Sequence, residues 1–158
     1  MTKFTCTKTF ADFAFAHRQH THDGHCALIH GHNWAFEFTF AADRLDPNGF
    51  VVDFGKLKWL KGLLEGYFDH TLLLNRDDPE LGYLKGVLTA NDRFDGSTRE
   101  KMPLAKIIVV PNCGAEKLAE WLLKEVNDHL GELYGDRQVR VIKVQVFEDA
   151  RNSATCED

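Results

Sequence analysis

The stretch His30–Phe40, which reads HGHNWAFEFTF, decides the fold of this chain of 158 residues. From Trp34 onward every second residue is aromatic, and the residues between them are small or polar. Alternation with a period of two is typical of a strand that buries one face. His30 and His32 continue the aromatic face at its N-terminal end. We therefore predict a central strand whose buried face begins with two histidines.

The preceding segment, Phe4–His17, predicts a second strand. Its aromatic residues keep one parity up to Phe10 and the opposite parity from Phe13 onward. A bulge between Phe10 and Asp12 reconciles the two halves, and bulges often lie beside active sites. If the two strands pair as a hairpin, His17 at the end of the first lies beside the histidines at the start of the second.

Two amphipathic helices are expected further along the chain. They are Asp53–Phe68, with Asp53 as a candidate N-cap, and Ala115–Leu133. Two more strands follow, Gln138–Glu148 and Asn152–Glu157. We predict an α+β fold of order ββααββ, in which a four-stranded antiparallel sheet carries two helices packed on one face.

A single domain spans residues 1–158 in this scheme, with a long irregular insertion at about 76–106. The second half of that insertion is polar and charged, and the whole is long for a loop without structure. We interpret it as a functional, mobile or family-specific segment. Ile107–Val110, directly after it, is a candidate for a short extra strand.

The bulk composition argues against several function classes. The formal net charge of −5 disfavours non-specific nucleic-acid binding, which needs a basic surface. No apolar run is long enough to span a bilayer, and the N-terminus lacks the apolar core of a signal peptide. The four cysteines form no C-x-x-C pair, so free thiols are expected. We therefore expect a cytoplasmic protein without nucleic-acid or membrane partners.

The histidines are the strongest functional signal, because most of the chain's eight lie between His17 and His32. Three neutral imidazoles that leave a fourth position open form a catalytic type of zinc site, and His17, His30 and His32 are placed to provide them. The alternative is a group of hydrogen-bonded histidines at the ends of two strands. The three histidines of the connecting loop are expected to be solvated, and we leave them out of the metal site.

Cys26, within that loop, admits three interpretations. It is a fourth ligand that closes a structural zinc site, an inert buried side chain, or a thiolate base or nucleophile beside the metal. Two further polar features are Asp69-His70, after the first predicted helix, and Glu148, which ends an apolar stripe. Taken alone, Asp69-His70 is better explained by an interaction of the histidine with the helix dipole.

Five features in chain order resemble one known family: Phe15-Ala16-His17, Cys26-x-x-x-His30-Gly31-His32-Asn33, Val52-Asp53-Phe54-Gly55, Asp69-His70 and Glu148. It is the 6-pyruvoyltetrahydropterin synthase / 6-carboxytetrahydropterin synthase family, whose members are zinc lyases of the tunnelling fold. The resemblance extends over about residues 4–148. It implies Zn²⁺ as cofactor, a pterin triphosphate as substrate, and a barrel-like homo-oligomer. That oligomer is a hexamer, a dimer of trimers with active sites at subunit interfaces.

The resemblance also implies a role for each matching residue. The family's zinc ligands match three histidines of this chain: His17, His30 and His32. Its catalytic set, which relays protons, matches three more residues: Cys26, Asp69 and His70. Glu148 matches the carboxylate that anchors the pterin ring, and Glu116 matches a glutamate near the pterin pocket.

The implied substrate is 7,8-dihydroneopterin triphosphate, from which the family makes two different products. Three residues separate Cys26 from His30. That spacing resembles the bacterial branch that forms 6-carboxy-5,6,7,8-tetrahydropterin with loss of triphosphate and acetaldehyde, and that feeds queuosine and other 7-deazapurines. The 6-pyruvoyl enzymes have a longer gap. We therefore expect the 6-carboxy product, with 6-pyruvoyl-tetrahydropterin as the alternative.

Two alternatives of another class are a non-catalytic zinc/pterin-binding module, in which Cys26 closes the site, and a zinc hydrolase with a metal-bound water. The chain also departs from the family pattern in two places. Cys113-Gly114-Ala115-Glu116 stands where the family has a Pro-Thr-x-Glu-like segment, and Asp149 stands where a threonine follows the anchoring glutamate. The first departure removes a hydroxyl and the second adds a negative charge, so both bear on pterin binding.

Overall fold

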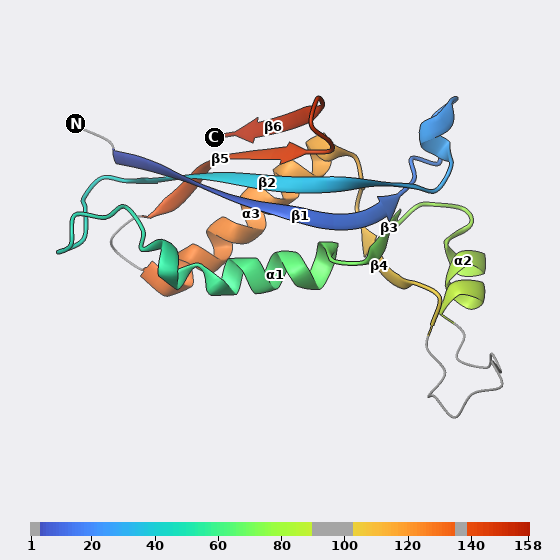
Figure 1. Cartoon of the computed structure of the whole chain (residues 1–158), viewed down its shortest axis with the longest axis horizontal. Helices are drawn as coiled ribbons and strands as arrows, with labels where there is room; N and C mark the ends of the chain where they lie inside the picture. Colours follow the sequence, from blue (N-terminus) through green and yellow to red (C-terminus); the bar gives the residue numbers. More distant parts are fainter. Residues whose placement is uncertain (1–3, 90–102, 135–138) are drawn as a thin grey trace.

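The computed structural model describes residues 4–89, 103–134 and 139–158. One sheet contains all the strands, side by side in the order β4-β3-β1-β2-β5-β6 (Figure 1). In chain order the strands are β1 (Phe4–His17), β2 (His30–Ala42), β3 (Thr71–Asn75), β4 (Lys106–Val110), β5 (Arg140–Phe147) and β6 (Ser153–Glu157). The helices are α1 (Lys58–Phe68), α2 (Leu81–Leu88) and α3 (Ala115–Tyr134), with short 3-10 helices η1 (His25–Ala27) and η2 (Phe54–Lys56). The predicted α+β class is confirmed.

The β1–β2 hairpin is the centre of the sheet, and its register is antiparallel as expected. The register shifts between Phe10 and Phe13, where Asp12 has a φ of 68°. This confirms the predicted bulge, and positive φ is a conformation that aspartate tolerates better than most residues. Phe10 and Phe13 are both buried as a result. The apolar face of β1 therefore runs without interruption to His17.

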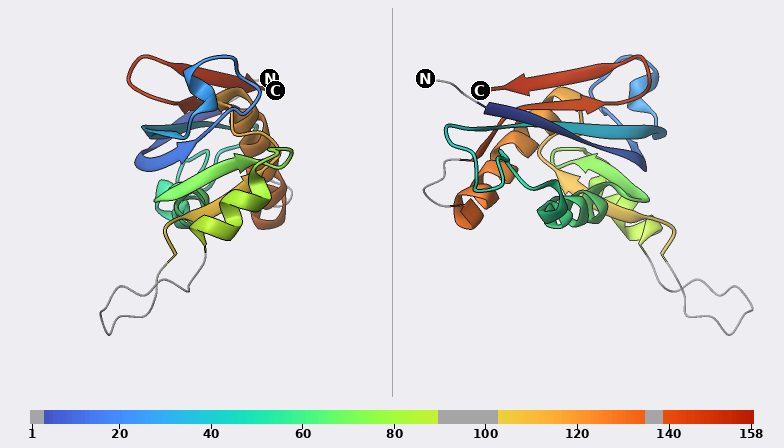
Figure 2. Two further views of the ribbon diagram at one scale, coloured as in Figure 1. Left: turned by 90° about the vertical axis from the view of Figure 1, so that its right-hand side faces the viewer. Right: turned by 60° about the vertical axis from the view of Figure 1, so that its left-hand side comes forward.

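The core lies between one face of the sheet and the helices α1 and α3, as Figures 1 and 2 show. Four side chains of β2 are completely buried: Trp34, Phe36, Phe38 and Phe40. The ring of Phe36 lies 4.6 Å from that of Phe68, which ties β2 to α1. Burying a side chain of this size stabilises the fold by about 1.5–3 kcal/mol. Among the described residues, no helix covers the opposite face of β1 and β2.

The predicted four-stranded antiparallel sheet is wrong, because the sheet is six-stranded and mixed. β3 pairs in parallel with β1, and β4 pairs in parallel with β3. All five residues of β3 are buried. A strand buried on both faces is a continuous apolar run without alternation, so the period-two pattern does not reveal it. The candidate extra strand Ile107–Val110 is confirmed as most of β4.

The helices also differ from the prediction, with three α-helices instead of two among the described residues. α2 falls within the segment predicted as irregular. It contains Gly82 and Gly86 and no buried residue, so its sequence has neither high helix propensity nor a core-facing stripe. Residues 90–102 of that segment lie outside the described residues. Asp53 caps η2, since its Oδ1 accepts the N–H of Gly55 at 2.9 Å, and α1 begins only at Lys58.

The pairing of β5 with β2 has a second register shift, which falls between Thr39 and Phe40 of β2. Val141 pairs with Phe40 and is completely buried, whereas Ile142 is only partly buried. The irregularity therefore turns Val141, and not Ile142, toward the core at the start of β5. No helix in the described part of the chain is long and apolar enough to span a membrane.

Candidate metal centre and its pocket

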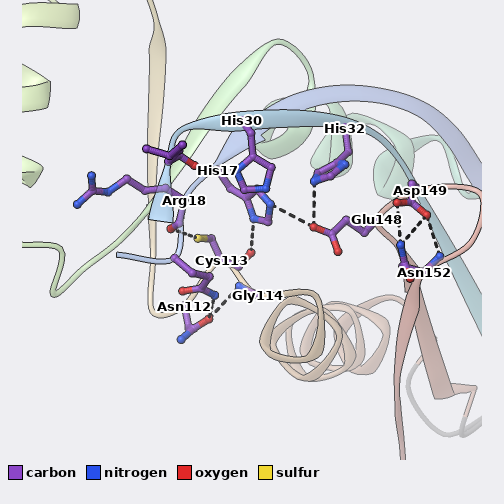
Figure 3. A network of polar contacts seen from close by, with 12 residues as sticks. His17, Arg18, His30, His32, Asn112, Cys113, Gly114, Glu148, Asp149 and Asn152 are labelled. Carbon is purple, nitrogen blue, oxygen red and sulfur yellow. Dashed lines mark hydrogen bonds and ion pairs between the residues drawn. The ribbon is translucent and has the colours of Figure 1, made fainter. Parts of the chain in front are cut away.

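Three histidines meet at one end of the β1–β2 hairpin. The register sets His17 directly opposite His30, and His32 opposite Phe15. The ring centre of His17 lies 4.7 Å from that of His30 and 5.6 Å from that of His32. Figure 3 shows the three side chains grouped on one side of the hairpin, together with Glu148. The hairpin thus brings together the three histidines that parity arguments select from the sequence.

Glu148 joins this group from the residue directly after β5. Its Oε1 lies 3.0 Å from Nε2 of His32 and 3.3 Å from Nε2 of His17. One ligand atom from each of His17, His30, His32 and Glu148 lies within 4.8 Å of the others. Four ligand atoms at about 2.0–2.2 Å from a tetrahedral ion lie about 3.3–3.6 Å apart. The spacing of these atoms therefore fits a single metal ion.

The nitrogens that face the carboxylate are otherwise unused. Nε2 of His17 and Nε2 of His32 are both buried, and neither has a hydrogen-bond partner of acceptable geometry, although Glu148 lies at ion-pair distance. Buried polar atoms without a hydrogen bond are uncommon in folded proteins and call for an explanation. Imidazole nitrogen and carboxylate oxygen are ordinary zinc ligands, so the donor set present fits that metal.

Backbone carbonyls hold the other ring nitrogens of two histidines. Nδ1 of His17 lies 3.0 Å from the carbonyl of Cys113, and Nδ1 of His30 lies 2.7 Å from that of Leu28. A ring that donates from Nδ1 keeps Nε2 as the unprotonated, metal-binding atom. Burial lowers the pKa of His17, although the carbonyl of Cys113 opposes that effect. His17 is therefore held in the neutral form that a metal requires.

A pocket of about 630 Å³ opens beside the histidines. Its lining includes His17 together with Cys26 from η1, Glu116 from the first turn of α3, and Glu148. Cys26 is exposed in the single chain. The fold thus brings to one pocket the cysteine and both glutamates that the sequence singled out.

Asp69 and His70 lie elsewhere, between α1 and β3. Nδ1 of His70 is 2.6 Å from Oδ1 of Asp69, and its backbone N–H donates to the carbonyl of Ala14. The His70 side chain is 85% exposed and its backbone φ is 54°. A histidine with positive φ is uncommon and marks a position that deserves a functional test. Neither residue lines the pocket of Cys26 within a single chain.

The loop histidines make other contacts. Nδ1 of His22 accepts the backbone N–H of Gly24 at 2.8 Å, and Nδ1 of His20 lies 3.4 Å from the amide nitrogen of Asn75. Within the described ranges, the group that could hold a metal contains none of the loop histidines.

Asp149 lies outside the lining of the pocket, and its carboxylate is held within the β5–β6 turn. Its carboxylate accepts the backbone N–H groups of Arg151 and Asn152, at 2.7 and 2.8 Å, and the side-chain amide of Asn152 (Figure 3). The N–H of Arg151 is the first cause of the lowered pKa of Asp149. The departure from threonine therefore caps the β5–β6 turn.

A cluster of amide side chains behind His17 was not foreseen from the sequence. Gln19 hydrogen-bonds to both Asn75 and Asn112, and the two asparagines accept the N–H groups of the turn that contains Cys113 and Gly114. The available signal was weak, since only Asn75 stands out as a polar residue that ends an apolar run. Burial raises the pKa of the Cys113 thiol to about 11, and its Sγ donates to the carbonyl of Arg18. Cys113 is therefore a structural thiol.

Fold and site together define a small α+β protein with a histidine–carboxylate group that could hold a metal at one end of a hairpin. The family model of 6-pyruvoyl tetrahydropterin synthase matches residues 5–158. The chain therefore belongs to that family of lyase-type enzymes.

Two relatives carry the name 6-carboxy-5,6,7,8-tetrahydropterin synthase over most of the chain. The protein from Rickettsia bellii is 32% identical over 90% of this chain and 92% of its own length. The protein from Aquifex aeolicus is 33% identical over 82% of this chain and 74% of its own. A relative from Rickettsia typhi with the same name is 42% identical, but the match spans only 49% of this chain and 56% of that protein.

Solved structures support the fold. An uncharacterized protein from Wolinella succinogenes aligns with a TM-score of 0.76 at 22% identity, covering 100% of this chain and 99% of that one. The 6-pyruvoyltetrahydropterin synthase of Plasmodium vivax aligns with a TM-score of 0.66 at 19% identity, covering 98% of each chain. At these identities the likeness concerns the fold alone.

Proposed function

We propose that this protein is a zinc-dependent lyase that converts 7,8-dihydroneopterin triphosphate and one water molecule to 6-carboxy-5,6,7,8-tetrahydropterin, triphosphate and acetaldehyde. The observation that carries the proposal is the convergence of His17, His30 and His32 on one point beside the pocket that contains Cys26 and Glu148. The names of the relatives from Rickettsia bellii and Aquifex aeolicus support the same reaction.

The three histidines would hold the metal through Nε2, because backbone carbonyls already occupy Nδ1 of His17 and His30. A bound zinc ion supplies Lewis-acid polarisation of the hydroxyls on the substrate's side chain. Cys26, as a thiolate, accepts a proton from a side-chain carbon of the substrate, and triphosphate then leaves by elimination. The exposure of Cys26 suits a group that must reach a substrate.

Glu148 anchors the pterin ring in this proposal, since a carboxylate can accept two parallel hydrogen bonds from the ring's amino and amide N–H groups. Its contacts with His17 and His32 put the ring close to the metal ligands. Glu116 lines the same pocket and is the second candidate for a pterin contact.

Asp69 and His70 complete the proton relay from a neighbouring subunit. Both side chains are exposed and neither lines the pocket of the same chain, which supports a homo-oligomer. The family resemblance suggests a hexamer built as a dimer of trimers. The uncovered face of β1 and β2 agrees with such an assembly. We place the protein in the cytoplasm and its product in the synthesis of queuosine or other 7-deazapurines.

The test is incubation of the zinc-loaded full chain with 7,8-dihydroneopterin triphosphate, followed by mass analysis. Triphosphate, acetaldehyde and the 6-carboxy product are expected. Triphosphate with a retained three-carbon side chain would favour 6-pyruvoyl-tetrahydropterin instead. Absence of turnover with zinc still bound would favour the non-catalytic zinc/pterin-binding module. Hydrolysis that releases the phosphates and leaves the three-carbon side chain with its hydroxyls would favour the zinc hydrolase.

A further inference from the structure

The turn between β4 and α3 carries the carbonyl that orients His17. The contact between that carbonyl, on Cys113, and Nδ1 of His17 is buried and joins residues 96 positions apart. Figure 3 shows the turn packed directly under the histidine ring. The orientation of one metal ligand therefore depends on how firmly this turn is held.

Side-chain amides hold both peptide units of the turn. Oδ1 of Asn75 accepts the N–H of Cys113 at 2.7 Å, and Oδ1 of Asn112 accepts the N–H of Gly114 at 2.8 Å. The N–H of Gly114 and the carbonyl of Cys113 belong to one planar trans peptide and point in opposite directions. Fixing that N–H therefore aims the carbonyl at His17, and Asn75 fixes the preceding peptide unit in the same way.

Gln19 links the two asparagines into a closed network. Its Oε1 accepts from Nδ2 of Asn75 at 2.8 Å, and its Nε2 donates to Oδ1 of Asn112 at 2.9 Å. A Cβ on Gly114 would lie 2.8 Å from that Nε2 and 3.1 Å from that Oδ1. The glycine of the Cys113-Gly114 departure therefore leaves room for the network.

Asn75 is the member with the strongest constraint. It is the last residue of β3, it is 2% exposed, and both ends of its amide have partners. We propose that Asn75 is a positioning residue for the metal site, which holds the Cys113 carbonyl on His17 and so keeps Nε2 of His17 directed at the metal. This inference rests on the proposed metal binding by His17, His30 and His32.

The consequence is measurable without turnover. Loss of the Asn75 amide frees the turn, and the ring of His17 then exchanges tautomers and rotates. Removing an outer partner of a metal-binding histidine typically weakens metal affinity by about 10–100-fold. The metal-free protein offers a second signal, because nitrogen NMR shifts of the imidazole distinguish the Nδ1–H tautomer from the Nε2–H tautomer.

The experiment titrates Co²⁺ into the metal-free full chain and follows the visible absorption of the bound ion. The variants are Asn75→Ala, Asn75→Asp and the matched control Asn127→Ala. Asn127 likewise uses both ends of its amide, although both contact the backbone of Val141, at 2.8 and 2.7 Å. It lies outside the amide network behind His17. The control therefore reports the cost of losing a similar pair of hydrogen bonds.

Asn75→Ala is expected to weaken Co²⁺ binding by about 10-fold, the low end of that range, because Asn75 acts on His17 only through the Cys113 carbonyl. It is also expected to alter the absorption spectrum and to populate the Nε2–H tautomer of His17. Asn75→Asp keeps an acceptor for the N–H of Cys113 and is expected to restore part of the affinity. Asn127→Ala is expected to lower the unfolding temperature but to leave Co²⁺ affinity, the absorption spectrum and the tautomer of His17 unchanged.

Unchanged affinity and spectrum in a folded Asn75→Ala protein, an Asn75→Asp protein that binds no better than Asn75→Ala, or an equal effect of Asn127→Ala would overturn the positioning role. Failure of the unmodified chain to bind Co²⁺ would instead overturn the proposed metal site.

Discussion

The two ends of the β1–β2 hairpin have the same backbone pattern and opposite chemistry. At one end, which we call the histidine end, His17 pairs with His30 beside His32 and Glu148. At the other, the apolar end, Phe4 pairs with Ala42. A pocket of about 390 Å³ opens there, and its lining is largely apolar: Phe4, Thr5, Cys6, Leu45, Gly49, Phe50, Val51, Val52, Asp53 and Phe54.

Packing explains the apolar end and the aromatic middle, but not the histidine end. The aromatic middle is the stretch from Trp34 to Phe40 on β2. Its buried aromatic side chains contain one polar atom without a hydrogen bond, the indole nitrogen of Trp34. The histidine end buries two imidazole nitrogens without hydrogen bonds, an arrangement that costs stability unless a ligand satisfies them. A bound ligand at the histidine end would satisfy both nitrogens.

The largest expected effect is on kcat/KM, and it should differ between a cysteine at the histidine end and one at the apolar end. Cys26→Ala should lower kcat/KM by about 10²–10⁴-fold with zinc content unchanged, because it removes the group proposed to move the proton. Cys6→Ala, at the apolar end, should leave turnover close to that of the unmodified chain. Steady-state kinetics and metal analysis of both variants test the contrast, and loss of zinc from Cys26→Ala would make Cys26 a structural ligand.

A substitution in the aromatic middle of the hairpin should lower the free energy of unfolding. Phe36 is completely buried and packs on Phe68, so Phe36→Ala should lower the free energy of unfolding by about 3–5 kcal/mol. Leu133→Ala, at a position 53% exposed, should change it by no more than about 0.5 kcal/mol. Urea unfolding of the metal-free proteins measures both, and equal values would contradict the described core.

The histidine end should also make stability depend on pH. Burial lowers the pKa of His17 below its ordinary value of about 6.5. Below about 6.5 the unfolded chain therefore binds a proton that the folded chain does not, so stability falls with falling pH and is retained above that value. The contribution is at most about 1.4 kcal/mol per pH unit. Urea unfolding of the metal-free chain between about pH 8 and pH 5 should show a shallower slope in His17→Phe.

Asp149→Ala is expected to have the smallest effect. The substitution removes the cap of the β5–β6 turn, so the unfolding temperature should fall slightly while zinc content stays unchanged. Calorimetry and metal analysis measure the two quantities. A marked loss of zinc would contradict metal binding by the three histidines alone, because it would show that the turn beside Glu148 also controls the metal.

Much of the hairpin and of the histidine group could be predicted from the sequence, because both follow from parity along two strands. Alternation placed His30 and His32 on the aromatic face, and the bulge near Asp12 restored His17 to it. Glu148 was recognisable as a polar end to an apolar stripe. Its 3.0 Å approach to His32 was not, because that distance depends on the pairing of β2 with β5.

The remaining features depend on contacts that local patterns do not encode. β3 is buried throughout and lacks alternation, and α2 lacks a buried stripe. The hydrogen bond from Cys113 to Asn75 joins residues 38 positions apart, and neither residue type alone predicts the other as its partner. Tertiary packing decides these features.

The most direct test of the central claim is the zinc content of the full chain by native mass spectrometry, with and without His30→Ala. We predict one zinc ion per chain in the unmodified protein, and none in the variant after dialysis against a mild chelator. An unmodified chain that binds no zinc, or a His30→Ala chain that retains it equally well, would contradict a metal site at the histidine end.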